Sequence, residues 1–214
     1  MSNLDSRYFT TADPKLSTVV FPLPWSWWSR PYEYAWCSQF VNKTDIVLDA
    51  ACGISHPFKF WLLDHTKEVH VCDCDKRILS NSEIKKDITN DFGPAWNIHA
   101  NTIERLNREC SLLENLPYET DKFDVVYCIS VLEHLPVPTN VLAIKELSRV
   151  LKPKGKLVLT FDVPDINPDS IDALLSDANL QRLGKLKIDR PDNAITSDIW
   201  GRPLYCFRTL AVKK

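Results

Sequence analysis

Short apolar runs alternate with amphipathic segments along most of the chain. Four runs rich in β-forming residues are bounded by turn-type residues, at residues 45–50, 68–73, 123–130 and 156–162. Runs of this length and composition predict buried strands. A further strand is expected near residues 103–107, and two more near residues 186–189 and 205–212.

Helical periodicity fills the intervals between these runs. The predicted helices cover residues 32–40, 57–65, 75–86, 139–151 and 170–183. The pattern is clearest over residues 139–151, where apolar positions share one side and Lys152, Pro153 and Gly155 follow the last turn. Strands that alternate with helices predict a doubly wound α/β fold with parallel strands and right-handed crossovers.

The N-terminal part differs in texture. The run FPLPWSWWSRPYEYAW contains four of the seven tryptophans, and three prolines interrupt its first half. We expect an aromatic-rich extension over residues 1–44, followed by one domain over residues 45–214. Three interpretations of the extension remain open: a lid or platform over a ligand site, packing against the sheet edge, or an anchor at a membrane surface.

Composition narrows the class of protein. The chain has 214 residues, of which 44% are hydrophobic and 25% charged, a globular balance. A net charge of −2 excludes a strongly basic surface, so no nucleic-acid partner is expected. The seven cysteines form no CxxC pair, which predicts reduced thiols in a cytoplasmic protein. No run approaches the ~18 apolar residues of a membrane span, and no secretory leader is expected.

Candidate chemistry lies where the predicted strands end, because ligands of open α/β sheets bind outside the carboxyl ends of strands. Asp73 ends the second strand at the distance from the first turn that is typical of a ribose-binding acid. A solvent-facing Asp that opens the next helix is the alternative. The turn after Asp49 keeps one glycine, Gly53, and could equally be an ordinary strand-to-helix turn.

Four segments in this order carry a family resemblance: VLDAACGIS, VHVCDCDKRIL, NLPYETDKFDVVYCISVLEHL and ELSRVLKPKGKLVLTF. Over about residues 45–163 the chain resembles a class I S-adenosylmethionine-dependent methyltransferase. The resemblance implies a Rossmann-like seven-stranded sheet with an antiparallel last strand and helices on both faces. It also implies S-adenosyl-L-methionine as cofactor and S-adenosyl-L-homocysteine as product.

The resemblance also implies a set of cofactor-binding residues. The set is Asp49, Ala51, Gly53, Ser55, Asp73, Cys74, Ser111, Leu112, Cys128 and Ile129. Its first four members would line the methionine part, and the Asp73 carboxylate would hold the two ribose hydroxyls. The backbone of Cys128 or Ile129 would contact the cofactor amino group.

Two departures from the family pattern concern this cofactor site. The glycine-rich turn has lost all but its central glycine. The acidic residue that the family often places before Leu116-Pro117 is also absent, so the Ser111 side chain or the Leu112 amide is expected at the adenine.

A hydroxyl acceptor needs a positioned base, and two residues are candidates. His134 follows the fourth strand and Asp162 ends the fifth. The alternatives are a helix-packing histidine and a turn residue before Pro164. Some relatives bind a metal through Glu-x-x-Glu-His at the first of these positions, but Ser130 replaces the first glutamate, so no catalytic metal is expected.

The expected acceptor is a small molecule methylated on oxygen or nitrogen, with a sugar or natural-product intermediate favoured. Within the extension, the aromatic set expected nearest the acceptor is Arg30, Tyr32, Tyr34 and Trp36. Two other functions remain open: an RNA or protein methyltransferase, and an S-adenosylmethionine-binding protein that does not methylate.

Overall fold

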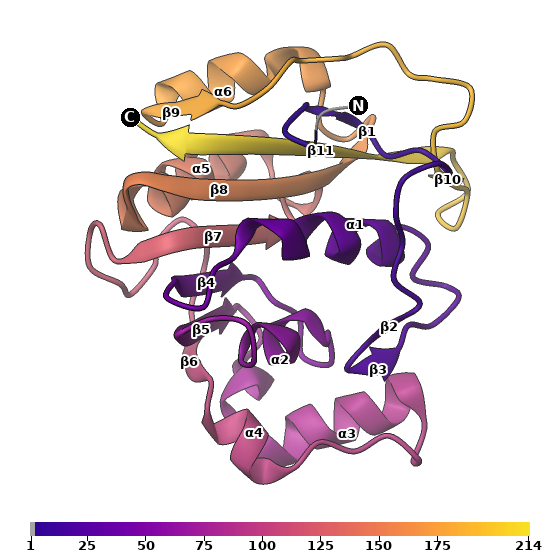
Figure 1. The fold of residues 1–214 in the computed structure, drawn as a ribbon, viewed down its shortest axis with the longest axis vertical. Coiled ribbons are helices and arrows are strands. Elements are labelled where there is room, and N and C mark those ends of the chain that lie inside the picture. The colour runs from indigo at the N-terminus through magenta and orange to yellow at the C-terminus, as the bar shows by residue number, and fades with distance from the viewer. Residues whose placement is uncertain (1–2) are drawn as a thin grey trace.

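A computed structural model describes residues 3–214, and a parallel sheet forms its centre (Figure 1). The parallel strands are β4 (Ile46–Ala50), β5 (Glu68–Asp73), β6 (Asn107–Cys110), β7 (Phe123–Ile129) and β8 (Leu151–Val163). Their order in the sheet is β8-β7-β4-β5-β6. The order reverses at β4, which lies between β7 and β5, and this is where ligands bind in open α/β sheets.

One long antiparallel strand extends the sheet beyond β8. This strand, β11 (Leu204–Lys213), pairs along its length with β8. Three short strands pair with it in turn: β1 (Arg7–Tyr8), β9 (Leu180–Arg182) and β10 (Thr196–Ser197). A separate hairpin joins β2 (Thr18–Val19) to β3 (Phe21–Pro22).

Helices cover both faces of the sheet (Figure 1). The α-helices are α1 (Arg30–Cys37), α2 (Phe58–Leu62), α3 (Asn81–Phe92), α4 (Ala100–Glu104), α5 (Val137–Val150) and α6 (Ile171–Asp177). The 3-10 turns are η1 (Ser38–Phe40), η2 (Lys76–Leu79), η3 (Leu132–His134) and η4 (Pro168–Ser170). Successive strand residues serve opposite faces: Val47 packs with the core under α1 to α4, and Leu48 with the core under α5 and α6.

The fold class predicted from the sequence is confirmed, including the antiparallel last strand. Two strand positions were wrong. Residues 103–107 span the end of α4, where Ile103 is fully buried, and a two-residue turn, and the edge strand β6 begins only at Asn107 with the mostly exposed sequence NREC. An exposed edge strand has no apolar pattern to reveal it. The strand expected near residues 186–189 is instead β9, because the predicted helix over 170–183 already ends at Asp177.

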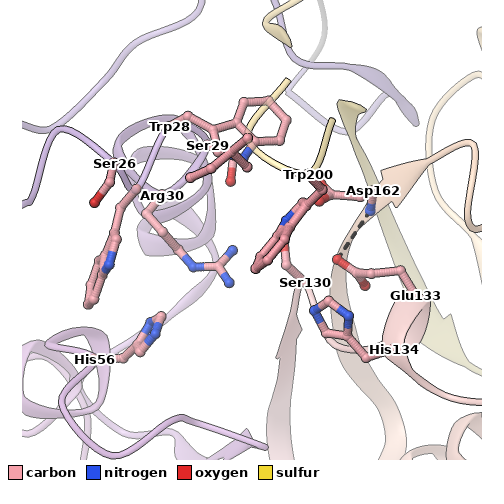
Figure 2. Close-up of a pocket in the computed structure, with 12 residues that line it drawn as sticks. Ser26, Trp28, Ser29, Arg30, His56, Ser130, Glu133, His134, Asp162 and Trp200 are labelled. Carbon is pink, nitrogen blue, oxygen red and sulfur yellow. Dashed lines mark hydrogen bonds between the residues drawn. The ribbon is translucent and has the colours of Figure 1, made fainter. Parts of the chain in front are cut away.

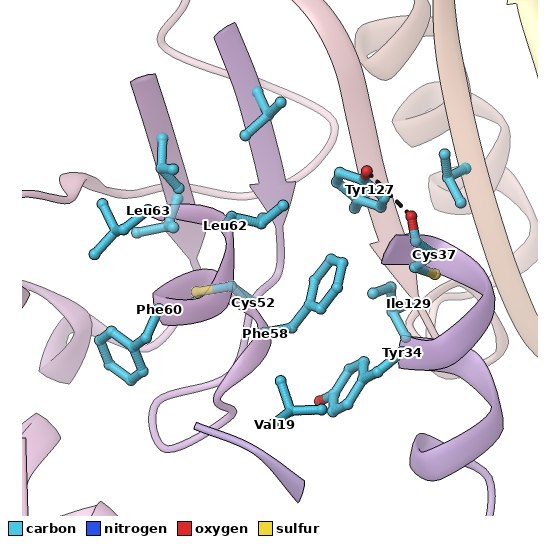
Figure 3. Close-up of a cluster of buried hydrophobic side chains, with 14 of the residues drawn as sticks. Val19, Tyr34, Cys37, Cys52, Phe58, Phe60, Leu62, Leu63, Tyr127 and Ile129 are labelled. Carbon is cyan, nitrogen blue, oxygen red and sulfur yellow. Dashed lines mark hydrogen bonds between the residues drawn. The ribbon is translucent and has the colours of Figure 1, made fainter. Parts of the chain in front are cut away.

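The N-terminal segment is built into the core. Its strand β1 adds to the sheet edge, and α1 buries Tyr34, Trp36 and Cys37 against the first face. Figure 3 shows Cys37 beside Tyr127 of β7, whose hydroxyl donates to the Cys37 carbonyl at 3.3 Å, while Tyr34 stacks on Phe58. The Trp36 indole N–H donates to the Asn3 carbonyl at 2.8 Å.

Trp36 therefore anchors this segment, and its loss should destabilise the whole protein. Trp36 is 2% exposed, whereas Trp25 in the same segment is 94% exposed. We expect Trp36→Ala to lower the free energy of unfolding by about 3–5 kcal/mol in urea titrations. Trp25→Ala, the matched control, should change it by less than about 0.5 kcal/mol. Equal effects of the two substitutions would contradict the structure.

Candidate functional site

Two adjoining cavities lie at the carboxyl ends of the central strands. The first, here called the turn cavity, has a volume of about 430 Å³ and is bordered by the turn after β4 and the end of β7. The second, the tryptophan cavity, measures about 200 Å³ and contains Trp27, Trp28 and Trp200 in its lining (Figure 2). Four residues line both cavities: Arg30, His56, Ser130 and His134. Molecules bound in the two cavities would therefore meet at these four side chains.

The turn after β4 bends through left-handed backbone. Ala51 has φ 54° and Gly53 has φ 63°, both in the region that L-residues rarely occupy. The Gly53 amide donates to Asp73 Oδ2 at 2.9 Å, and the Asp75 amide donates to Asp73 Oδ1 at 2.9 Å. The Asp73 carboxylate thus joins the turns that follow β4 and β5. Each oxygen still has a second lone pair that can accept a hydrogen bond.

A buried lysine braces the same turn. Lys59 of α2 is 0% exposed, and its ammonium donates to the Gly53 carbonyl at 2.6 Å and to the His56 carbonyl at 2.8 Å. Nearby Asp49 is the penultimate residue of β4, and burial raises the pKa of its carboxyl to about 7 although Lys59 acts to lower it. The sequence analysis missed Lys59, because a lysine at the start of a helix gives no sign of being buried.

His56 closes one end of the turn cavity. Its Nδ1 lies 2.8 Å from the Tyr34 hydroxyl, and the Trp27 indole stacks on its ring with centroids 4.2 Å apart. The ring also lies so close to Gly53 that a Cβ there would come within 2.6 Å of it. Burial, with Arg30 and Lys59 nearby, holds the pKa of His56 well below its usual value, so the imidazole is neutral at pH 7.

A buried carboxylate connects the N-terminal helix to the strand ends. Glu33 of α1 is 0% exposed, and it accepts hydrogen bonds from the hydroxyls of Ser130 at 2.7 Å and Thr160 at 2.5 Å. Its other oxygen is 2.5 Å from Nη1 of Arg30. Burial alone would raise the pKa of Glu33, but Arg30 and the two hydroxyls lower it. The ion pair fixes Arg30 at the junction of the two cavities.

Two acids form one wall of the tryptophan cavity. The Asp162 amide donates to Glu133 Oε1 at 3.2 Å (Figure 2). The remaining oxygens, Glu133 Oε2 and Asp162 Oδ1, are inaccessible and have no hydrogen-bond partner among residues 3–214. Burial raises the pKa of Glu133 to about 8 and that of Asp162 to about 7, and nearby carboxylates add to both shifts.

The structure brings part of the predicted residue set to these cavities. Predicted residues that line the turn cavity are Arg30, Tyr34, Asp49, Ala51, Gly53, Cys74, Ile129 and His134. Asp162 and His134 line the tryptophan cavity, and the His134 side chain is exposed. Asp73 lines neither cavity and contacts the turn that borders the first one, as described above.

Other predicted residues lie outside both cavities. Ser55 is buried and its hydroxyl donates to Asp91. The Cys128 side chain is in the core, and Leu112 is exposed beyond β6. Next to it, the Ser111 amide donates to the Asp73 carbonyl at 3.0 Å, and its hydroxyl has no partner among the described residues.

The acceptor set expected from the extension needs correction. Trp36 lies in the core against Phe9 and Phe40, away from both cavities, because its large indole fills the space under α1. Tyr32 packs against the same core and does not line either cavity. Trp27 and Trp28 line the tryptophan cavity instead, and the exposed loop before β11 contributes Trp200 to the same lining. Tryptophan content alone could not distinguish core from cavity residues.

Residues 3–214 contain no group of three or more His, Cys, Asp or Glu side chains placed to hold a metal ion. None of the helices described is both long and apolar enough to cross a membrane.

Comparison with known proteins gives a consistent result. A family model described as a methyltransferase domain matches residues 48–159. An uncharacterized protein of Methanocaldococcus jannaschii is 33% identical over 134 residues, which is 62% of this chain and 46% of that protein. A probable methyltransferase of Aspergillus luteorubrus is 29% identical over 134 residues, 58% of this chain and 42% of that protein. The matches thus span less than half the length of these relatives.

A solved structure shares the fold. The TehB-like SAM-dependent methyltransferase of Corynebacterium glutamicum superposes with a TM-score of 0.58 at 16% identity. The superposition covers 85% of this chain and 87% of that one. At this identity the likeness concerns the fold alone.

The raised pKa of Glu133 predicts a pH-dependent stability. A carboxyl whose pKa rises from about 4 in the unfolded chain to about 8 in the folded protein stabilises the fold at low pH and loses this contribution as pH rises. We expect urea midpoints to fall as pH rises from about 5 to about 8 and to level off above pH 8, and to fall less in Glu133→Gln. The exposed Glu119→Gln, as control, should follow the wild type. An identical fall in all three proteins would show that Glu133 ionises normally.

Proposed function

Because the chain belongs to the methyltransferase domain family, we propose that it transfers the methyl group of S-adenosyl-L-methionine to oxygen or nitrogen of a small molecule. The observation that carries this proposal is the pair of joined cavities. A methyl donor in the turn cavity and an acceptor in the tryptophan cavity would have their reacting atoms at the shared residues. Holding the two in line is the main task of such an enzyme.

The residues of the turn cavity fit the cofactor. The left-handed turn at Ala51 and Gly53 leaves the backbone open to close approach, and a volume of about 430 Å³ is in the range of ligand sites. Asp73, next to this turn, keeps free lone pairs for the ribose hydroxyls, and Ile129 lines the turn cavity. When bound, the sulfonium would supply an electrophilic methyl group.

The chain's own residues would orient the two reactants and manage the proton. Arg30, fixed by Glu33, places a cation at the junction, where it can hold an anionic group of either reactant. Asp162 and His134 remain our candidate bases, since both line the tryptophan cavity. Of the two, Asp162 is the more deeply placed and has an unpartnered oxygen.

The size of the tryptophan cavity supports a small acceptor. About 200 Å³ accommodates a compact molecule of the kind found among sugars and natural products. In this proposal the extension, residues 1–44, acts as part of the acceptor site through Trp27, Trp28 and Arg30. All seven cysteines are free, which supports a reducing, cytoplasmic location as part of the proposal.

Cofactor binding tests the proposal directly. Calorimetric titration with S-adenosylmethionine and S-adenosylhomocysteine should give saturable binding, and Asp73→Ala should weaken it at least tenfold, or about 1.4 kcal/mol. Asp75→Ala is the matched control, because that carboxylate pairs with Arg77 on the surface. Absence of binding to the wild type, or equal affinity of Asp73→Ala and wild type, would contradict this assignment.

A further inference from the structure

The tryptophan cavity holds acceptor atoms that no donor satisfies. Glu133 Oε2 and Asp162 Oδ1 have no hydrogen-bond partner among the described residues, although both are inaccessible. Buried polar atoms are normally paired, so two missing partners on one wall point to a ligand that supplies them. Where these carboxyls are ionised, the missing groups are donors, because an ionised carboxylate oxygen only accepts.

The charges around this wall leave a negative excess. Arg30 is paired with Glu33 at 2.5 Å, and Arg202 with Asp165 at 2.5 Å, so these four groups cancel in pairs. The two histidines that line the cavity add no cation to this wall: His134 is exposed, and His56 is neutral because burial lowers its pKa. Glu133 and Asp162 remain without a cation.

Glu133 and Asp162 share one wall of the cavity and influence each other through charge. Their pKa values of about 8 and about 7 lie close together, and the charge of Asp162 raises the pKa of Glu133. The pair therefore holds about one proton and one negative charge near pH 7.5. A ligand with a single positive charge complements it.

The other walls favour the same ligand. Three indoles line the cavity, from Trp27 and Trp28 of the N-terminal segment and Trp200 of the loop before β11 (Figure 2). Aromatic faces attract ammonium groups, and the attraction is strongest for tryptophan. A hydroxyl group would bring one donor and no charge, whereas a primary ammonium brings three donors and one charge. Of these two groups, the ammonium alone has enough donors for both unpartnered oxygens and also brings the missing positive charge.

Building on the proposed function, we propose that the tryptophan cavity binds a small primary amine as its ammonium ion, and that Glu133 and Asp162 together take the proton the amine must lose before methylation. Glu133 thereby joins Asp162 in the proton transfer. The sequence alone predicts His134 and Asp162 as the candidate bases.

The step balances in atoms and charge. The ammonium gives one proton to the carboxylate pair and becomes a neutral amine. The nitrogen lone pair then forms the bond to the methyl carbon as the carbon–sulfur bond breaks, and the bonding electrons stay on sulfur. The product is a methylated ammonium ion, and the carboxylate pair later releases its proton to solvent.

Binding of model ligands to the protein without cofactor tests this proposal. The probes are 2-phenylethylamine and 2-phenylethanol, which match in shape and differ in the charged group, titrated by calorimetry at pH 7.5. We expect the amine to bind at least tenfold more tightly than the alcohol. Amine binding should also release protons, detected as a dependence of the heat on buffer ionisation enthalpy, because a bound cation favours the ionised acid pair.

Variants assign the effect to the two acids. Glu133→Gln and Asp162→Asn, each checked for folding by circular dichroism, should reduce amine affinity at least tenfold and abolish proton release. Alcohol affinity should fall much less than amine affinity, because only one neutral hydrogen bond is affected, and the exposed Glu119→Gln should behave as wild type.

Other outcomes would overturn the proposal. Equal affinity for amine and alcohol, or tighter binding of the alcohol, would assign the cavity to a neutral hydroxyl acceptor. Full amine affinity in both variants would exclude the acid pair as its partner. These titrations contain no cofactor, so they measure amine binding independently of S-adenosylmethionine binding. Failure of S-adenosylmethionine to bind would contradict the proposed function but would not change the amine result.

Discussion

The buried carboxylate of Glu33 is the interaction on which the site depends. An ionised carboxylate inside a protein is unfavourable unless hydrogen bonds and a counter-charge surround it. Here the hydroxyls at the ends of β7 and β8 and the Arg30 guanidinium provide them. Removing one partner would leave a charge buried, so the helix α1 and the two strand ends are held in one arrangement. That arrangement places Arg30 where the two cavities meet.

The turn after β4 shows a second constraint of the same kind. The chain has only five glycines, and its turn keeps only Gly53. Its shape is maintained by polar contacts from two sides, the Lys59 ammonium on the carbonyls and the Asp73 carboxylate on the Gly53 amide. The buried Lys59 cation and the Asp73 anion thus hold a turn conformation that several glycines would otherwise make accessible through their conformational freedom. The backbone remains open toward the cavity, as the proposed cofactor site requires.

Much of this architecture could be predicted from the sequence. The strand over residues 68–73 has the predicted bounds, and most of the cavity residues at strand ends were identified from the rule that ligands bind there. Glu33, Lys59 and Trp200 could not be found in this way, because their roles arise from contacts between segments far apart in the chain. Trp36 and Trp27 lie in the same aromatic run, yet one fills the core and the other lines a cavity. The apolar periodicity of so short a segment does not predict which tryptophan is buried in the core and which lines a cavity.

The position of the bound cofactor relative to the two cavities decides whether the proposed function is correct. A crystal structure with S-adenosyl-L-homocysteine measures this directly. We predict the nucleoside in the turn cavity beside Asp73, with the sulfur at the junction of Arg30, His56, Ser130 and His134 and facing the tryptophan cavity. A ligand bound elsewhere, or a sulfur separated from the tryptophan cavity by protein side chains, would contradict the account.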